Sequence, residues 1–397
     1  MKKLMLLGGL GYLIPVIDAA HREGYHVITC DYIPDNIAHR YSDEYHNVSI
    51  VEKDKVLGLA RTLDIDGIMS FAVDPGVVTA AYVQEKMGLP GNPYDSVCIL
   101  QDKSRFRKFL KDNGFNVPAA ISACNIEEAM EKISGLNFPV IVKPVDSAGS
   151  KGVTKIENPE YLPPAFDHAM EYSICGKVIV EEFIEKEGCS SDSDSFSVDG
   201  KLVFTSFSAQ RFDISAPNPY TPAAYSWPST MPEATEKELE AEIQRLISLL
   251  GMKTSVYNIE TRLGTDGKAY IMEVSPRGGG NRLSEMLRLS TGTDLIAAAV
   301  RSAVGDDPGH IKPCSYKGHW AEIILHSDKS GIYRKIEISH EMQGHVVTTD
   351  LLVKPGDPVR KFNGANDCIG TMALKFDTEE SLEAALSDMS WIKTIVE

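Results

Sequence analysis

Short apolar runs alternate with helical stripes in the first quarter of the chain. An apolar run at residues 4–7 is followed by a glycine turn at residues 8–11, apolar positions at helical spacing over residues 14–20, and a second apolar run over residues 25–31. This order predicts a strand, a helix and a second strand parallel to the first. Because the alternation continues almost to its end, the segment 1–95 is predicted to form an open parallel-sheet, Rossmann-like domain.

Strand patterns dominate the next part of the chain, after a helix predicted for residues 102–113. Short apolar runs separated by turn residues indicate a mostly antiparallel lobe over about residues 116–185. An amphipathic helix is predicted for residues 233–250, because leucines and isoleucines recur there at helical spacing. A smaller α/β section is predicted for residues 312–397, which leaves residues 96–311 as the central domain. The predicted fold class is therefore α/β.

Two alternating strands between Ser255 and Pro276 flank an Asp266-Gly267 turn, which is a favoured two-residue hairpin turn. Counting outward from this turn gives five predicted pairs: Thr265 with Lys268, Leu263 with Tyr270, Thr261 with Met272, Glu260 with Glu273, and Asn258 with Ser275. Like charges that face each other destabilise a sheet, and a divalent cation held by both carboxylates relieves them. The alternative is a solvated hairpin face with two harmless glutamates.

The hairpin is followed directly by a glycine-rich stretch, Arg277-Gly278-Gly279-Gly280-Asn281-Arg282. Glycines let the backbone approach a ligand closely, and arginine forks match phosphate or carboxylate groups. A flexible connector would have the same composition. The adjacent acid pair favours a functional site.

A strand predicted at residues 138–142 ends in Lys143 and runs into a segment of small residues, 146–152. Backbone N–H groups of such a segment can surround phosphate oxygens, although the Walker pattern is absent. Further along, Glu181 and Glu182 end another predicted strand. Each segment alone is equally explained by an ordinary turn or a solvated strand end.

Length and charge restrict the class of protein. A chain of 397 residues exceeds the length at which one hydrophobic core usually stops growing, so two or three domains are expected. The formal net charge of -16 argues against general binding to nucleic acid or anionic membranes. No apolar run reaches the roughly 20 residues of a membrane span. Seven scattered cysteines without a C-x-x-C pair fit a reducing cytoplasm without structural zinc.

Four features occur in this order along the chain: Lys103, Lys143 with its serine and glycine segment, the V-E-E-F-I strand end, and Glu260 with Glu273. In these features the chain resembles the ATP-grasp superfamily. Within it, the chain resembles most the carbamoyl-phosphate-synthase-like and L-amino-acid-ligase branch. The resemblance covers nearly the whole chain. It implies that residues 1–95 precede an ATP-grasp fold of two α+β lobes. It also implies a ligase that activates a carboxylate as an acyl phosphate and transfers it to an amine or a thiol, with release of ADP and phosphate.

The resemblance assigns roles to residues of this sequence. ATP phosphates would be contacted by Lys103, Lys143 and the 147–152 segment, with Ser147, Gly149, Ser150 and Gly152. The adenine would be lined by Glu181, Glu182, Phe183 and Ile184, and the ribose would be contacted by Glu187. Magnesium, or manganese in its place, would be bound by Glu260 and Glu273. Arg277 would act with Lys143 in catalysis and hold the transferring phosphate or the substrate carboxylate, and the substrate would also be contacted by Gly279, Asn281 and Arg282.

Two features depart from the family pattern. Ser275 stands where the family usually has an asparagine, and a hydroxyl is a poorer metal ligand than an amide carbonyl, so at least one magnesium ion is implied rather than two. The ribose-binding acid is displaced, which leaves Glu187 as the candidate. In addition, the stretch Gln210 to Pro228 is expected to be a loop that covers the substrate.

Other functions stay open on the sequence alone. A bicarbonate-using carboxylase of the ATP-grasp type and a non-catalytic nucleotide-binding regulator would use the same residues. A nicotinamide-dependent oxidoreductase would explain Gly9, Gly11 and Asp31, which follow strands as in dinucleotide-binding sites, but not the hairpin acids or Lys143. For the ligase the partners are small-molecule carboxylates and nucleophiles, with no nucleic acid and no membrane, and a homodimer is compatible with the sequence.

Overall fold

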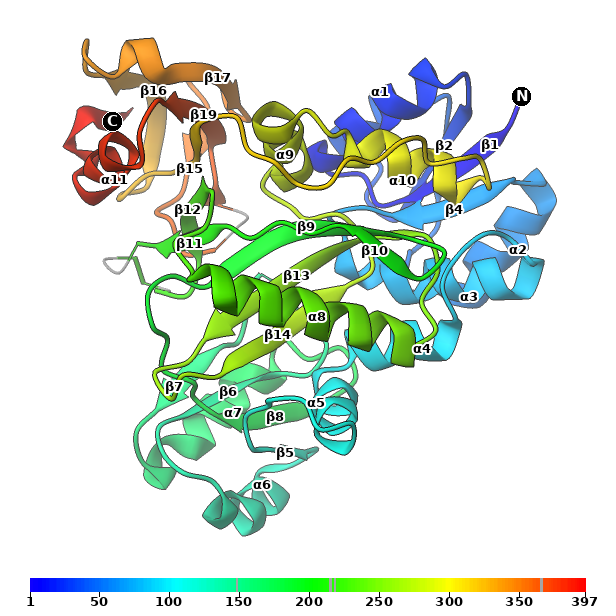
Figure 1. Ribbon diagram of the computed structural model, residues 1–397. Helices are drawn as coiled ribbons and strands as arrows, with labels where there is room; N and C mark the ends of the chain where they lie inside the picture. Colours follow the sequence, from blue (N-terminus) through cyan, green and yellow to red (C-terminus); the bar gives the residue numbers. More distant parts are fainter. Residues whose placement is uncertain (148, 214–215, 218, 365–366) are drawn as a thin grey trace.

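The computed structural model describes residues 1–147, 149–213, 216–217, 219–364 and 367–397. Its strands form five sheets within the described residues. In the view of Figure 1 the N-terminal parallel sheet and the C-terminal strands lie above a central antiparallel sheet, and a smaller antiparallel lobe lies below it. None of the described helices is long and apolar enough to cross a bilayer.

The N-terminal sheet is fully parallel, as predicted, with the strand order β3-β2-β1-β4. Its strands are β1 (Lys3–Leu7), β2 (His26–Asp31), β3 (Glu44–Asn47) and β4 (Gly67–Ser70). The interior strand β1 is fully buried from Leu4 to Leu7, which explains its unbroken apolar run. The helices of this region are α1 (Ile14–Arg22), α2 (Lys53–Leu63), α3 (Val77–Met87) and α4 (Tyr94–Gln101).

The lobe that was predicted to be mostly antiparallel has the strand order β5-β8-β6-β7, and all its pairs are antiparallel. Its elements are β5 (Ala120–Ala123), α6 (Ile126–Lys132), β6 (Val140–Pro144), β7 (Thr154–Ile156), α7 (Leu162–Met170) and β8 (Val178–Glu182). Helix α5 (Lys103–Asp112) precedes it, and the Asp102 side chain accepts hydrogen bonds from the backbone N–H groups of Ser104 and Arg105. This N-cap fixes where α5 begins.

The central sheet has the order β10-β9-β13-β14 and carries the predicted hairpin. Its strands are β9 (Ser191–Val198), β10 (Lys201–Phe204), β13 (Ser255–Leu263) and β14 (Ala269–Ser275). Helix α8 (Glu233–Leu249) packs on it with the predicted apolar face: Leu239, Ile243, Leu246 and Ile247 are buried against Tyr257, Ile259 and Ile271.

The hairpin register is partly as predicted. Asn258 pairs with Ser275 and Glu260 with Glu273, as expected. The predicted pairs Leu263 with Tyr270 and Thr261 with Met272 are wrong, because the observed partners are Ala269 and Ile271. The predicted pair Thr265 with Lys268 is wrong as well, because the Thr265 N–H bonds to Glu185 instead. Met272 is skipped in the pairing as a β-bulge, and the chain turns one residue earlier, with Gly264 N–H bonded to the Lys268 carbonyl. The bulge offsets the longer turn, so the acids still face each other.

Nine of the nineteen residues from Gln210 to Pro228 lie in strands, so the loop prediction is wrong for these residues, and the substrate-covering role of the stretch stays a prediction. It contains β11 (Ala209–Phe212) and β12 (Pro222–Trp227), which are antiparallel to each other. Proline, serine and tyrosine were taken as loop signals, but Tyr225 and Trp227 are buried strand residues. Residues 214, 215 and 218 of this stretch lie outside the described residues.

The strands β11 and β12 join a sheet of order β11-β12-β15-β19-β17. Its other members are β15 (His319–Leu325), β17 (Val346–Leu351) and β19 (Gly370–Phe376), and a small sheet beside it contains β16 (Gly331–Ile338), β18 (Pro358–Val359) and β20 (Ile392–Val396). The remaining helices are α9 (Leu283–Thr291), α10 (Leu295–Ala303) and α11 (Glu379–Ser387). α10 packs on α1, so the chain returns from the central sheet to the N-terminal domain.

Candidate active site

A row of three carboxylates crosses the central sheet. Glu273 on β14 faces Glu260 on β13, and Glu260 in turn faces Asp192 on β9. The side chains of Glu260 and Glu273 are about one third exposed, at 34% and 36%. Burial raises the pKa of Glu260. The charge of Arg262 lowers this pKa, and the charge of Glu273 raises it. The row is therefore a site where negative charge accumulates.

No group of three or more His, Cys, Asp or Glu side chains within the described part of the chain converges closely enough to hold a metal ion alone. The facing pair Glu260 and Glu273 still offers the oxygen donors that magnesium prefers. Magnesium usually combines one or two carboxylates with substrate phosphates and water, so two facing acids suffice chemically.

Lys103 lies beside this row. Its Nζ is 3.4 Å from Glu273 Oε2 and donates a hydrogen bond of 3.0 Å to the carbonyl oxygen of Ser147. The position is set by α5, which begins at Lys103 directly after the Asp102 cap. The structure thus brings together two sequence candidates from α5 and β14 and ties both to the small-residue segment.

Lys143 on β6 belongs to a buried ion cluster. Its Nζ forms an ion pair with Glu181, and Arg107 Nε donates a 2.8 Å hydrogen bond to the other oxygen of the same carboxylate. Burial opposes ionisation of Glu181, yet the charges of Arg107 and Lys143 outweigh it and lower the pKa of Glu181 to about 2. Burial lowers the pKa of Lys143, and the charge of Glu181 opposes that shift. Glu181, an adenine candidate, is engaged here with two cations.

The small-residue segment forms a tight turn after β6. Gly149 and Gly152 have positive φ values of 70° and 69°, which favour glycine. A Cβ on Gly152 would lie 3.2 Å from the Ala169 backbone, so this glycine is also required by the approach to α7. The Ser150 hydroxyl donates to the Tyr220 carbonyl at 3.0 Å. Ala148 of this segment lies outside the described residues.

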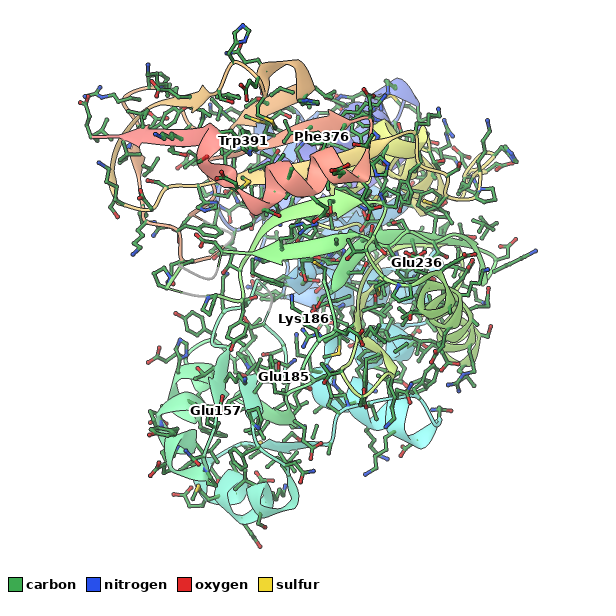
Figure 2. The ribbon with its side chains drawn as sticks, turned by 60° about the vertical axis from the view of Figure 1, so that its left-hand side comes forward. Glu157, Glu185, Lys186, Glu236, Phe376 and Trp391 are labelled. Atoms are coloured by element: carbon green, nitrogen blue, oxygen red, sulfur yellow. The ribbon has the colours of Figure 1, made fainter. Side chains whose placement is uncertain are left out.

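The stretch after β8 connects the lobe to the hairpin. The Ile184 carbonyl accepts a hydrogen bond from Arg262, and the Phe183 ring lies 4.4 Å from the Lys155 ammonium. Glu182 points elsewhere, because its carboxylate accepts hydrogen bonds from Asn137. The Glu187 backbone N–H bonds to Leu263, and its side chain is exposed. Figure 2 shows the neighbouring Glu185 and Lys186 between the lobe that carries Glu157 and the sheets above it.

Arg277 is almost fully buried and is bound to the N-terminal domain. Its Nε and Nη2 donate to the two oxygens of Asp74 at 2.9 and 2.8 Å, and its Nη1 donates to Asn258 at 3.0 Å. The Ser275 hydroxyl also donates to Asp74, at 2.9 Å, and accepts from Gln101. Arg277, which the resemblance placed at the transferring phosphate, and Ser275, which stands in place of the family's asparagine, are thus both engaged with Asp74 of the N-terminal domain.

The glycine triplet fits closely into its surroundings. The Gly279 N–H donates to Asp194 Oδ1 at 2.9 Å, and a Cβ there would lie 2.6 Å from Leu283. Asn281 and Arg282 both have positive φ values. Arg282 forms ion pairs with Glu285 and Asp350. Close packing explains Gly278, where a Cβ would lie 2.1 Å from the Phe71 ring, and Gly279, whereas a Cβ on Gly280 would have no neighbour within 4 Å.

Four charged residues of this region were missed by the sequence analysis: Asp74, Arg107, Asp192 and Asp194. Arg107 lies in a lysine-rich helix whose charges indicate a solvated face, yet it is 4% exposed. The two aspartates lie in the serine-rich run of β9, whose alternation S-D-S-D-S is a strand signal that places both on one face. Asp74 has no local signal that we can identify.

The glycine turn of the N-terminal domain is filled by its own side chains. A Cβ on Gly9 would lie 2.5 Å from the His39 ring, and the Asp31 carboxylate accepts hydrogen bonds from Tyr32 N–H and Asn36. These contacts give the turn and the acid local packing roles. They weaken the dinucleotide interpretation of this segment.

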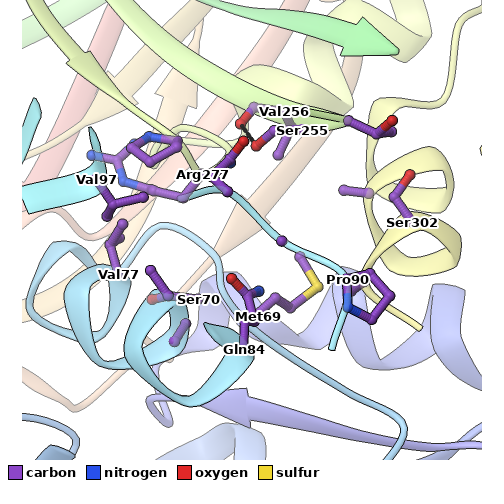
Figure 3. A pocket seen from close by; sticks show the side chains of 18 residues that line it. Met69, Ser70, Val77, Gln84, Pro90, Val97, Ser255, Val256, Arg277 and Ser302 are labelled. Atoms are coloured by element: carbon purple, nitrogen blue, oxygen red, sulfur yellow. Dashed lines mark hydrogen bonds between the residues drawn. The ribbon is translucent and has the colours of Figure 1, made fainter. Parts of the chain in front are cut away.

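A cavity of about 70 Å³ lies behind Arg277, between α3, α10 and the start of β13. Figure 3 shows Gln84, Ser255 and Ser302 around it. Neither the lysines Lys103 and Lys143 nor the facing acids line it. The cavity is therefore a packing feature of the junction between the N-terminal domain and the central sheet.

Comparison with protein families finds that residues 136–285 match the ATP-grasp domain. A curated relative, the carbamoyl phosphate synthase large chain of Thermotoga petrophila, is 26% identical over 287 residues, covering 71% of this chain and 26% of that protein. The chain thus spans about a quarter of the length of the curated relatives it matches.

Solved structures share the fold over the whole chain. The L-amino acid ligase from Bacillus licheniformis superimposes with a TM-score of 0.82 at 19% identity, covering 100% of this chain and 99% of that chain. Phosphoribosylglycinamide synthetase from Anaerococcus prevotii gives a TM-score of 0.77 at 23% identity, covering 100% of both chains. The match extends through the N-terminal parallel sheet and the C-terminal strands.

Proposed function

We propose, from the premise that this chain belongs to the ATP-grasp ligases, that it activates a small-molecule carboxylate with ATP and transfers the acyl group to an amine. The intermediate is an acyl phosphate, and the products besides the amide are ADP and phosphate. The observation that carries the proposal is the facing pair Glu260 and Glu273 with Lys103 beside it.

The facing acids support a magnesium site. When bound there with ATP, magnesium supplies positive charge to the transferring phosphoryl group. Glu260 and Glu273 provide its oxygen ligands from two adjacent strands, where neither backbone can move independently. Ser275 is bonded to Asp74, which supports the smaller metal requirement of at least one ion.

The two lysines support the phosphate assignment. The charges of Lys143 and Lys103 both lower the pKa of Glu260. A phosphate bound at the acid row would therefore be attracted by both lysines. Lys103 also lies in the first turn of α5, where the helix dipole adds positive potential. Fixed cations in a partly buried site stabilise the charge that develops during phosphoryl transfer.

The choice of an amine is supported by the similarity of the fold to an amino acid ligase, at a TM-score of 0.82. An assay distinguishes this amine ligase from an enzyme that uses a thiol or bicarbonate, and from a regulator that binds ATP without turnover.

We further infer a cytoplasmic protein, which its seven free cysteines support. A homodimer is testable by light scattering.

The test is ADP and phosphate release with magnesium and ATP across pairs of carboxylates and amines, with bicarbonate and thiols as separate arms. In the productive pair, Glu273→Gln should lower turnover by about a hundredfold or more, because a ligand charge at the phosphoryl group is lost. Its melting temperature should not fall, since one of two facing charges is removed.

The matched control is Glu238→Gln, a change of the same charge at an exposed position on α8, which should keep full turnover. Near-normal turnover of Glu273→Gln would contradict the metal assignment. ATP binding without ADP release in any arm would instead support a regulator, and release only with bicarbonate would support a carboxylase.

A further inference from the structure

Strand β15 carries a carboxylate that the proposed reaction does not use. Glu322 is 1% exposed, and neither of its oxygens has a hydrogen-bond partner among the described residues. Burial raises its pKa well above the usual value. A buried carboxyl group without partners costs several kcal/mol or more, so its presence needs an explanation.

The register of the sheet shows where Glu322 points. Glu322 pairs with Tyr225 on β12, and Tyr225 pairs with Gln210 on β11, so the three side chains lie on one face. The Tyr225 hydroxyl donates to Asp192 Oδ2 at 3.1 Å. Because Asp192 faces Glu260, the face that carries Glu322 adjoins the far end of the acid row.

Nearby cations do not neutralise Glu322. Arg282 attracts it, but that guanidinium already forms ion pairs with Glu285 and Asp350, and Glu285 and Asp192 repel Glu322. On β19, Thr371 pairs with Ile324, two residues from Glu322 on the same face, and its hydroxyl also has no partner within the described residues. The surroundings of Glu322 therefore carry an excess of negative charge.

A narrow cavity lies beside Arg282, the cation whose charge acts on Glu322. It is lined by Tyr12, Phe71, Gly279, Arg282, Ser284 and Glu285. Glu322 does not line this cavity itself, and the Tyr225 hydroxyl is the contact that joins its face of the sheet to Asp192. The cavity reaches the glycine triplet that follows the hairpin.

We propose that Glu322 binds a non-reacting amino group of the organic substrate, at the end of the acid row remote from phosphoryl transfer. An ammonium group supplies three N–H donors and a positive charge, which match two free carboxylate oxygens and an acidic environment. A hydroxyl supplies one donor and no charge, and a second carboxylate is repelled. The inference rests on the proposed function, since it names the chemistry of the substrate for that site.

The test uses four-carbon acids that differ only in one group: 2-, 3- and 4-aminobutyrate, the corresponding hydroxybutyrates, and butyrate. Binding to the protein with magnesium and a non-hydrolysable ATP analogue is measured by calorimetry. At least one amino acid of the series should bind about tenfold or more tightly than its hydroxy counterpart, which is the value of a hydrogen bond to a charged group. The position of the amino group in the acid that binds most tightly then reports the distance between Glu322 and the reacting carboxylate.

Two variants separate binding from folding. Glu322→Gln and Glu322→Met should both abolish the preference for the amino compound, and Glu322→Met should raise the melting temperature, because an unpartnered acid is replaced by an apolar side chain of similar size. The control Glu337→Gln, at an exposed position on β16, should retain the preference.

Retention of the preference in the Glu322 variants, or no preference in the wild-type protein, would overturn the proposal. A lower melting temperature of Glu322→Met would show that the acid is structural and would also overturn it. Failure of the proposed ligase function is a separate result, because it is read from ADP release and the preference is read from binding without turnover.

Discussion

At the scale of single residues, the ion cluster around Glu181 sets how much positive charge is left to bind a phosphate. One buried carboxylate is shared between two cations, Arg107 and Lys143. Arg107 also donates to the carbonyl of Met272, the bulge residue of the hairpin, so it links the lobe to the acid row. One positive charge is left in excess, and a phosphate is the natural partner for it.

The shared carboxylate makes a pH-dependent contribution to stability. The pKa of Glu181 is about 2 in the folded chain against an ordinary 4.5, so the contribution is complete above pH 4.5 and is lost as the pH falls towards 2. Glu181→Gln should lower the free energy of unfolding at pH 6 by about 3 kcal/mol. It should also flatten the dependence between pH 4.5 and pH 2.

Urea unfolding of both proteins at pH 6, 5, 4 and 3 checks this expectation. Other acids titrate equally in the two proteins, so the difference between the curves isolates Glu181. Parallel curves would mean that Glu181 does not carry the acid sensitivity.

At the scale of elements, the start of α5 combines a stabilising cap with Lys103, the lysine proposed to bind ATP. Asp102 caps the helix by accepting from the backbone of Ser104 and Arg105, and Lys103 is the first helical residue. The same few atoms therefore fix the helix end and the direction of the Lys103 side chain towards Ser147 and Glu273.

Asp102→Ala should lower the free energy of unfolding by about 1 kcal/mol, the usual value of an N-cap. It should also weaken ATP binding several-fold, because Lys103 is no longer held in place. The control is Asn125→Ala, which removes the cap of α6 through the Glu128 N–H and lies away from the acid row. Calorimetric titration with ATP and urea unfolding separate the two effects, and equal ATP affinity in both variants would refute the positioning role of the cap.

At the scale of the whole molecule, one buried ion pair joins the N-terminal domain to the loop after the hairpin. Asp74 accepts two hydrogen bonds from Arg277, and the Ala72 N–H bonds to the Gly278 carbonyl beside it. Burial opposes ionisation of Asp74, and the charge of Arg277 outweighs it and lowers the pKa. The position of the glycine triplet thus depends on a domain that is distant in sequence.

Asp74→Asn should lower the free energy of unfolding by about 3 kcal/mol or more, because Arg277 is left as a buried charge without its partner. ADP release should fall as well, since the glycine triplet loses its anchor. Asp95→Asn, which removes the exposed partner of Arg105, should cost less than about 1 kcal/mol. Urea unfolding and the ADP assay on both variants provide the comparison, and equal stability would contradict the role of this ion pair.

Much of the fold could be predicted from local pattern. The parallel strands and the helix α8 with its buried leucines follow from the spacing of apolar residues. The facing pair Glu260 and Glu273 was found by counting from the predicted turn, and it holds because the bulge offsets the longer turn. The register of the hairpin near its turn could not, because a bulge at Met272 depends on contacts with other elements. The binding roles of Lys103 and Lys143 stay predictions, supported by the way the structure groups them with acids.

The sequence by itself determined which faces of its strands and helices are apolar, because the periods of about 3.6 and 2 residues are local properties. Only the tertiary structure decided which element covers each face. Arg107, Asp74 and Glu322 read locally as ordinary charged residues, and their burial depends on partners that are distant in the chain. The charge balance of the site, including the free carboxylate that suggests an amine ligand, arises from those long-range contacts.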